Sequence, residues 1–347
     1  MTIIYFILIL GITVMVHEFG HFLFAKKAKV HVYEFSIGMG PRIFKWKRKN
    51  DETEYSIRLF PIGGYVQMAG EDNEDEKKVP KEGLMQSKTW FQRFMITIAG
   101  VMFNFIMSII LLFFIALFTG SPQSEAYIGI LEENYPAYSS GLEVGDEITH
   151  INDKRVSSAD ILLLELEINK GKTVTFTVKK EDGTVKNVTI EPVRIEENET
   201  EVYKYGFGLS TKVKTGFLAA IKYAFQKTFI LIHQMVLIIG NLFTGGLSLN
   251  SLSGPVGIYN VVGETAKAGF VNLIFLLAYI SINVGFMNLL PIPAFDGGRL
   301  LFLIIEKIKG SPVDSKIENI IHSIGFILLM ALMLFITYND IVRIFFK

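Results

Sequence analysis

Residues Ile3 to Ala25 read IIYFILILGITVMVHEFGHFLFA, a stretch that is apolar enough to span a bilayer and yet contains His17-Glu18-Phe19-Gly20-His21. Ionisable side chains are unfavourable at membrane depth, so three within five positions indicate a functional site. His17 and His21 are four residues apart and project from one face of a helix. Two neutral imidazoles at this spacing can bind zinc, while Glu18, about 100° around the helix, can activate water as a general base. The stretch therefore predicts a metal centre within the membrane.

Two other interpretations of this stretch are a helix that ends early, with hydrated histidines near a membrane surface, and a cleavable signal peptide. The signal peptide is disfavoured because the stretch has no basic region before it and no A-x-A-like site after it. Lys26, Lys27 and Lys29 follow instead, as they do at the cytoplasmic end of a retained span. We therefore expect a first transmembrane helix whose N-terminus is outside.

The composition is that of a membrane protein. Half of the 347 residues are hydrophobic, and 34 basic residues balance 34 acidic ones, so the net charge is zero. There is no basic patch interleaved with aromatic residues, so no nucleic-acid partner is expected. Because the chain has no cysteine, any metal site must use histidine, carboxylate or water ligands.

The segments after the first helix return the chain to the membrane from the cytoplasm. The loop 26–93 is rich in lysine and arginine, and the positive-inside rule places it in the cytoplasm. Residues 42–47 and 54–60 alternate apolar and polar side chains around a turn, which predicts a β-hairpin. This hairpin either dips into the membrane beside the first helix or forms a small cytoplasmic ribbon. The second span is Phe94 to Phe118, where Asn104 is expected to connect helices rather than to take part in catalysis.

Residues 123–210 have the composition of a soluble domain, placed outside by the two preceding spans. Their apolar pattern predicts strand, turn, strand, helix and two further strands. This order suits a PDZ-like fold, and the turn at Gly141-Leu142-Glu143-Val144-Gly145-Asp146 resembles that of PDZ domains in bacterial membrane proteases. Such domains bind peptides by adding a strand to a sheet edge.

The segment Gly216 to Leu242 is long and apolar and poses the main topological question. It carries a polar stripe on one helical face that includes Lys222 and Gln226. The stripe favours an amphipathic helix lying in the outer interface over a transmembrane span. The next segment, Leu252 to Ile258, contains a Gly-Pro pair and is expected to interrupt any helix.

The remaining spans are expected at Phe270 to Leu290 and at Ile320 to Ile336, connected by a basic cytoplasmic loop. The sequence thus predicts a polytopic α-helical membrane protein of four transmembrane helices, with a cytoplasmic-side β-hairpin and one inserted extracytoplasmic PDZ-like α+β domain. The expected parts are an N-terminal membrane half at 1–122, the PDZ-like domain at 123–210, an interfacial segment at 211–269 and a C-terminal membrane half at 270–347.

A catalytic zinc ion takes three protein ligands and keeps one position open, so a third ligand is needed. Asp296 is the best candidate because it is the first acidic residue after the start of the third span, in a segment loosened by prolines and glycines. Alone it could equally be a helix-terminal carboxylate beside Arg299, but the H-E-x-x-H helix favours the ligand. Asn288 is placed to donate an amide hydrogen bond nearby. Three rival histidines are expected in loops or interfaces without a matching buried partner: His31, His233 and His322.

Together these motifs make the chain resemble the site-2 protease family of intramembrane zinc metalloproteases, in the bacterial branch with one PDZ domain. The resemblance covers nearly the whole length. It rests on the H-E-x-x-H helix and on Gly38-Met39-Gly40-Pro41, Pro61-Ile62-Gly63-Gly64-Tyr65-Val66, Ser253-Gly254-Pro255-Val256-Gly257-Ile258 and the segment Asn288 to Gly298. Two departures from the family pattern, Val101 and Phe295, are not at ligand positions.

The resemblance implies an enzyme of the bacterial cytoplasmic membrane, with both termini and the PDZ domain outside. Its expected substrates are single-span membrane proteins, such as anti-sigma factors trimmed outside and remnant signal peptides, cut within their transmembrane segments. Membrane lipid is the other expected partner. Zn²⁺ is expected on His17, His21 and Asp296, with Glu18 as the base and Asn288 assisting catalysis. Residues implied to bind the substrate are Gly63, Gly64, Tyr65, Asn288 and Pro291.

Two alternatives belong to other functional classes. A catalytically inactive scaffold could bind peptides through its PDZ domain, but such a scaffold would not need Glu18. A metal transporter would need further ligands within the membrane, and the sequence offers none.

Overall fold

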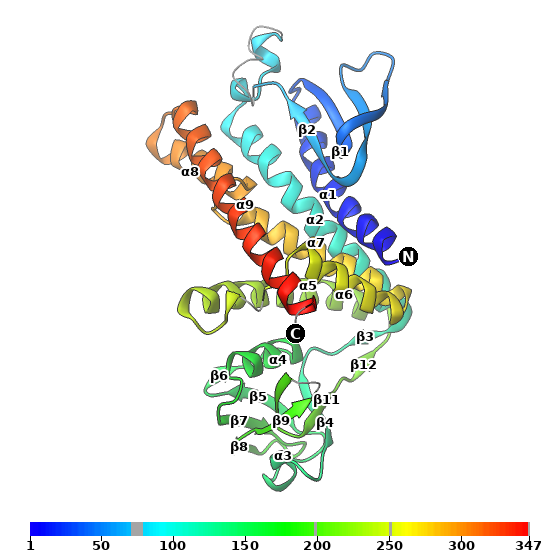
Figure 1. Ribbon diagram of the computed structural model, residues 1–347, viewed down its shortest axis with the longest axis vertical. Helices are drawn as coiled ribbons and strands as arrows, with labels where there is room; N and C mark the ends of the chain where they lie inside the picture. Colours follow the sequence, from blue (N-terminus) through cyan, green and yellow to red (C-terminus); the bar gives the residue numbers. More distant parts are fainter. Residues whose placement is uncertain (71–78, 198–199, 250–251, 346–347) are drawn as a thin grey trace. The chain divides into compact units, whose positions relative to one another are not determined.

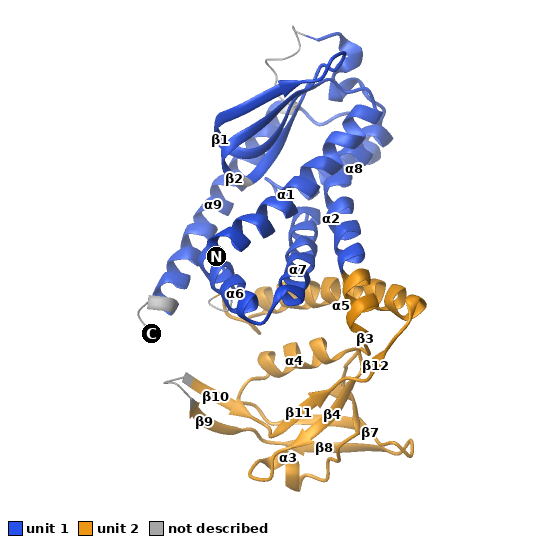
Figure 2. Cartoon of the chain, turned by 90° about the vertical axis from the view of Figure 1, so that its right-hand side faces the viewer, with its two compact units in different colours: residues 1–111, 250–347 blue, residues 112–249 orange. Residues whose placement is uncertain are grey.

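Figure 1 shows the computed structural model, which describes residues 1–70, 79–197, 200–249 and 252–345. The chain divides into two compact units, drawn in different colours in Figure 2. The first unit combines residues 1–111 and 250–347, and the second consists of residues 112–249. All the candidate ligands belong to the first unit, so this unit positions the site.

Five helices in the described part of the chain are long and apolar enough to cross a membrane. Four of them coincide with the spans expected from the sequence, and the fifth is the segment expected to be interfacial. They are α1 (Thr2–Lys27), α2 (Trp90–Thr119), α5 (Phe217–Thr244), α7 (Phe270–Leu289) and α9 (Ser315–Phe345).

Small residues bring α1 and α2 into close contact at the level of the H-E-x-x-H motif. A Cβ atom added at Gly20 would lie 2.5 Å from the backbone oxygen of Ala99, so only glycine allows this approach. On its other side α1 packs against α7, where Phe6 and Ile9 share a buried cluster with Leu276. The first helix is therefore held between α2 and α7 within the first unit.

The predicted hairpin is present, and its strands are longer than expected. β1 (Val32–Lys47) pairs with β2 (Glu54–Met68), and the segment 34–37 has partners in both 54–57 and 64–67. The chain reverses through Gly38, whose φ of +88° is a conformation that glycine adopts without strain. This folding places the segment 64–67 at one edge of the sheet, with a pairing partner on one side only among the described residues.

The hairpin is anchored to the first two helices through a shared apolar core. Phe35 and Val66 pack with Ala25 of α1 and Ile96 of α2, all of them buried. The sheet therefore lies beside the end of α1 that carries His21.

Two expectations for the C-terminal half are wrong in detail. The Gly-Pro segment is helical in its second half, because α6 (Pro255–Lys267) begins within it. Proline is tolerated at the first position of a helix, where its missing N–H has no intrahelical partner anyway. The basic loop after the third span is also largely helical, as α8 (Asp296–Lys309). Its apolar residues, including buried Leu300 and Leu303, pack against the unit, and the Nε1 hydrogen of Trp90 bonds to the Leu303 carbonyl at 2.6 Å.

The second unit contains an α+β domain with one main sheet. The strand order is β11-β4-β5-β7-β8, with β6 paired to β5, and the core includes Phe176, Ile128 and Leu162. The predicted order of strands and helix is present. The elements are β4 (Ala126–Leu131), α3 (Pro136–Ser139), β5 (Glu147–Ile151), β6 (Lys154–Arg155), α4 (Ala159–Ile168), β7 (Val174–Lys179), β8 (Val185–Ile190) and β11 (Phe207–Ser210).

Two further strand pairs complete this unit and were not expected from the sequence. One is formed by β9 (Val193–Glu197) and β10 (Thr200–Lys204), and the other by β3 (Ser121–Pro122) and β12 (Val213–Lys214). The unit also includes α5, whose Lys227 Nζ bonds to both carboxylate oxygens of Asp160 in α4, at 2.8 and 2.7 Å. The middle of α5 is therefore tied to the soluble domain.

Candidate metal centre

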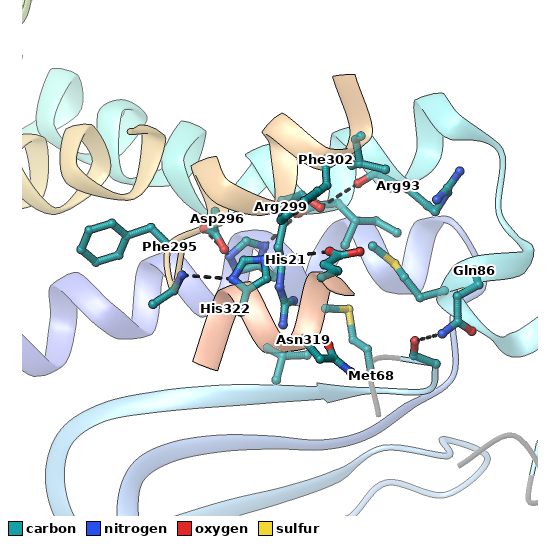
Figure 3. A pocket seen from close by; sticks show the side chains of 18 of the residues that line it. His21, Met68, Gln86, Arg93, Phe295, Asp296, Arg299, Phe302, Asn319 and His322 are labelled. Carbon is teal, nitrogen blue, oxygen red and sulfur yellow. Dashed lines mark hydrogen bonds and ion pairs between the residues drawn. The ribbon is translucent and has the colours of Figure 1, made fainter. Parts of the chain in front are cut away.

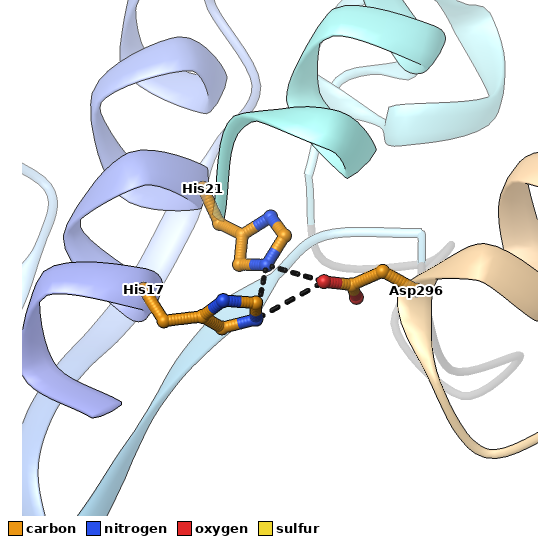
Figure 4. Close-up of side chains that lie close together, drawn as sticks. All are labelled: His17, His21 and Asp296. Carbon is orange, nitrogen blue, oxygen red and sulfur yellow. Dashed lines mark hydrogen bonds and ion pairs between the residues drawn. The ribbon is translucent and has the colours of Figure 1, made fainter. Parts of the chain in front are cut away.

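Three side chains from two distant parts of the sequence converge at one point of the first unit. His17 and His21 are on the buried face of α1, and Asp296 is the first residue of α8 (Figure 4). The Oδ2 atom of Asp296 lies 3.0 Å from the Nε2 atom of His17 and 3.2 Å from that of His21. The two Nε2 atoms are 3.2 Å apart.

Hydrogen bonding fixes which nitrogen of His21 faces its neighbours. Nδ1 lies 2.8 Å from the backbone oxygen of Ile96, which can only accept, so Nδ1 carries the hydrogen. In the neutral ring Nε2 then presents a lone pair toward the Oδ2 atom of Asp296, an oxygen that is buried without a hydrogen-bond donor among the described residues. Lone pairs that face each other at this distance repel unless a cation lies between them.

His17 has a corresponding neighbour in α2. Its Nδ1 atom lies 3.3 Å from the side-chain amide nitrogen of Asn104, whose Oδ1 is buried without a partner among the described residues. The two ends of an amide are interchangeable by rotation, so Asn104 can equally offer Oδ1 to an Nδ1 hydrogen. Nε2 of His17 is then also free of hydrogen and faces Asp296. The expectation that Asn104 connects helices is met, but its partner is a candidate metal ligand.

The donor set fits zinc in type and in spacing. Two imidazole nitrogens and one carboxylate oxygen form a common catalytic ligand set. A tetrahedral zinc ion with ligand bonds of about 2.0 Å separates its ligand atoms by about 3.3 Å. The three observed separations of 3.0, 3.2 and 3.2 Å match this value.

A glycine in α2 makes room for the two imidazoles. A Cβ atom added at Gly100 would lie 2.4 Å from Nε2 of His21 and 2.7 Å from Cε1 of His17. Any side chain here would displace both rings. The role of Gly100 depends on helix packing and could not be predicted from the sequence.

The candidate ligands and Glu18 line a cavity of about 840 Å³ between α1, α2, α8, α9 and the hairpin (Figure 3). The hairpin contributes Tyr65, Val66 and Met68 to its wall. Gly64 lies against Glu18, since an added Cβ would be 3.8 Å from Glu18 Cγ. One cavity is therefore lined by Glu18, by the three candidate ligands and by the edge segment 64–67.

A buried carboxylate holds Tyr65 in this wall. Glu34 accepts hydrogen bonds from the Tyr65 hydroxyl at 2.8 Å, from Arg58 at 2.9 Å and from Ser56. Burial raises the pKa of the Glu34 carboxyl, but these hydrogen bonds outweigh burial and hold the pKa below its ordinary value. The ionised carboxylate thus fixes the orientation of the edge segment.

The other residues expected at the site are less close to it. Gly63 is buried next to Met39 of the hairpin. Asn288 is half-buried near the end of α7, and Pro291 is exposed; neither is among the residues that line the cavity. His322, expected to have no buried partner, instead lies in the cavity wall, and its Nδ1 accepts a hydrogen bond from the Ala294 N–H.

The sequence also matches known proteins along nearly its full length. Residues 5–332 match the model of peptidase family M50. The zinc metalloprotease RasP of Bacillus licheniformis is 35% identical over 421 aligned positions, which cover 99% of each protein. RasP of Bacillus subtilis, the regulator of sigma-W protease, is 34% identical over 422 positions with the same coverage.

Among solved structures, the PDZ domain of an SdrC-like protein from Listeria monocytogenes is 23% identical, with a TM-score of 0.22. The matched region covers 25% of this chain and 88% of the Listeria chain. The full-length relatives and the apolar helices identify the chain as a multi-pass membrane zinc metalloprotease. The chain belongs to peptidase family M50, the site-2 protease family.

Proposed function

We propose that this protease cleaves peptide bonds within the transmembrane segments of single-span membrane proteins, using zinc held by His17, His21 and Asp296. The observation that carries the proposal is the convergence of these three side chains in a cavity lined by α1, α2 and α9, helices that are apolar enough to span a membrane. A site enclosed by such helices acts on substrates that reach it from the lipid phase.

The chemistry divides between the metal and Glu18. Bound zinc would polarise the scissile carbonyl and lower the pKa of water. Glu18 is next to His17 on α1 and faces the same cavity, where its carboxylate takes a proton from the attacking water and returns it to the leaving amine. The hydrogen bond from His21 to Ile96 keeps that ring oriented through the cycle.

The substrate has to be extended at the site, because a helical peptide bond is shielded by its own backbone. The edge segment 64–67 has partners on one side only among the described residues and lies against Glu18. We infer that a substrate strand adds to this edge, which aligns its backbone beside the base. Gly63, Gly64 and Tyr65 are then the substrate-binding residues, with Asn288 and Pro291 further from the cavity.

The substrate class is inferred from the name of one relative. RasP of Bacillus subtilis is a regulator of sigma-W protease, and we extend this to anti-sigma factors, with remnant signal peptides as a second class. The test is co-expression with candidate single-span proteins. The proposal expects shortened membrane fragments with the wild-type chain and none with Glu18→Gln. Cleavage confined to soluble proteins would contradict it.

Substituting Gly100 by alanine is expected to lower zinc affinity about 10- to 100-fold, the range seen when groups around a metal site are disturbed. The added methyl group would lie 2.4 Å from Nε2 of His21 and would push the ring out of place. Zinc affinity is measured by competition with a chromogenic chelator. Gly240→Ala is the matched control, because a Cβ there meets nothing within 4 Å. Unchanged affinity in Gly100→Ala would mean that the rings do not bind the metal as placed here.

We further propose four spans, with α5 in the outer interface and both termini and the PDZ-like domain outside. Lys227 is ten residues into α5, which is roughly 15 Å along the helix and would be mid-bilayer if α5 crossed. Its ammonium group instead pairs with Asp160 of the soluble domain, and this contact supports an interfacial α5.

Single cysteines test this topology, because the chain has none of its own. Lys47→Cys and Lys309→Cys are expected to be protected from an impermeant reagent added outside, whereas Asp182→Cys is expected to be labelled. If Lys309→Cys is labelled and Lys47→Cys is not, α5 crosses the membrane and the four-span topology is wrong.

A further inference from the structure

The loop that leads into Asp296 has few backbone hydrogen-bond donors of its own. Pro291 and Pro293 have no N–H group, and Ala294 has a φ of +82°, an unfavourable conformation for a residue with a side chain. Asp296 follows two residues later. A strained backbone persists only where its surroundings hold it, so the position of this carboxylate depends on what packs against the loop.

The last helix supplies that contact. Nδ1 of His322 accepts a hydrogen bond from the N–H of Ala294, with 3.0 Å between the two nitrogen atoms. The ring is also packed against Phe302 of α8, with 5.7 Å between ring centroids. Figure 3 shows His322 beside Phe295 and Asp296 in the cavity wall.

One helical turn further along α9, Gly325 lets the helix backbone approach the same loop closely. A Cβ atom added at Gly325 would lie 2.4 Å from Cβ of Pro293 and 2.8 Å from its backbone oxygen. The first turn of α8 is equally tight, since a Cβ at Gly298 would be 2.7 Å from the Ile292 oxygen and 3.2 Å from Cε1 of His322. The loop is therefore enclosed between α8 and α9 at backbone contact distance.

We infer that His322 is a positioning residue for the metal site: by accepting the Ala294 hydrogen bond, it holds the strained loop in the conformation that directs Asp296 toward His17 and His21. This inference rests on the proposed zinc site. Because His322 belongs to α9, the packing of the last helix sets the geometry of a ligand on another helix. His322 touches neither the substrate nor the metal in this role.

The test compares two replacements at position 322 in the full-length chain in detergent. His322→Leu keeps the bulk but removes the acceptor, and it is expected to weaken zinc binding about 10- to 100-fold and to lower kcat with KM little changed. His322→Asn places an amide oxygen where Nδ1 was, and it is expected to restore both quantities to within about threefold of the wild type. Zinc affinity is read by chelator competition, and kcat and KM are read on a purified single-span substrate.

Two more variants guard against misfolding and nonspecific effects. Gly325→Ala leaves the hydrogen bond but pushes on Pro293, and it is expected to weaken zinc binding as His322→Leu does. Ile324→Ala, at an exposed neighbouring position of α9, is expected to behave as the wild type. Wild-type zinc affinity in His322→Leu, or equal loss in His322→Leu and His322→Asn, would overturn the inference. A wild-type chain that binds no zinc would instead refute the proposed site.

Discussion

Replacing Glu18 by glutamine is expected to abolish peptide cleavage while leaving zinc bound at one ion per chain. The amide has the shape of the carboxylate but cannot take a proton, so the water is no longer activated; general-base catalysis is worth about 10²- to 10⁴-fold in rate. Zinc is retained because the three converging ligand atoms belong to other residues. The measurement is cleavage of a purified single-span substrate, with the metal content of the same sample determined by mass spectrometry.

The control for this prediction is Glu264→Gln, an exposed glutamate of α6 that pairs with Lys267. It makes the same chemical change in the same unit, away from the cavity, and it is expected to cleave normally. If Glu18→Gln retained more than a few per cent of the wild-type rate, Glu18 would not be the base.

Removing a ligand is expected to abolish both zinc binding and cleavage, whereas Glu18→Gln abolishes cleavage alone. His17→Ala and Asp296→Asn each delete one of the three atoms that lie 3.0 to 3.2 Å apart. Zinc affinity is expected to fall by more than the roughly 10- to 100-fold seen when a residue that only orients a ligand is replaced. The measurement is zinc content after dialysis against a chelator at a fixed free-zinc concentration.

His233→Ala is the matched histidine control, because His233 is an exposed residue of α5 in the second unit. Its zinc content is expected to equal that of the wild type. If His17→Ala retained full zinc while His233→Ala lost it, the ligand set would be misassigned.

Sequence reasoning reached those parts of the site that are encoded locally. The spacing of His17 and His21 depends only on helical periodicity, and the apolar length of each span depends only on bilayer thickness. Asp296 could be selected because acidic residues are scarce in that region of the chain. The structure brings these three residues together as the sequence implied.

What the sequence could not predict depends on contacts between distant segments. The importance of Gly100 is visible only when α2 is placed against the two imidazoles, and Asn104 meets His17 only in that same packing. His322 looked like an isolated histidine because its partner is a backbone N–H 28 residues away. The sequence did not predict that α6 begins at Pro255. A Gly-Pro pair can mark the end of one helix or the start of the next, because proline is tolerated at the first helical position.

The most direct test of the central claim is X-ray absorption at the zinc edge of purified Glu18→Gln protein, which keeps the metal without turning over. We expect one zinc per chain with a first shell of nitrogen and oxygen at about 2.0 to 2.1 Å and the multiple scattering of two imidazoles. The Asp296→Asn and His17→Ala variants should lose this signal. A folded chain without zinc, or a zinc shell without histidine scattering, would contradict a metal centre built from His17, His21 and Asp296.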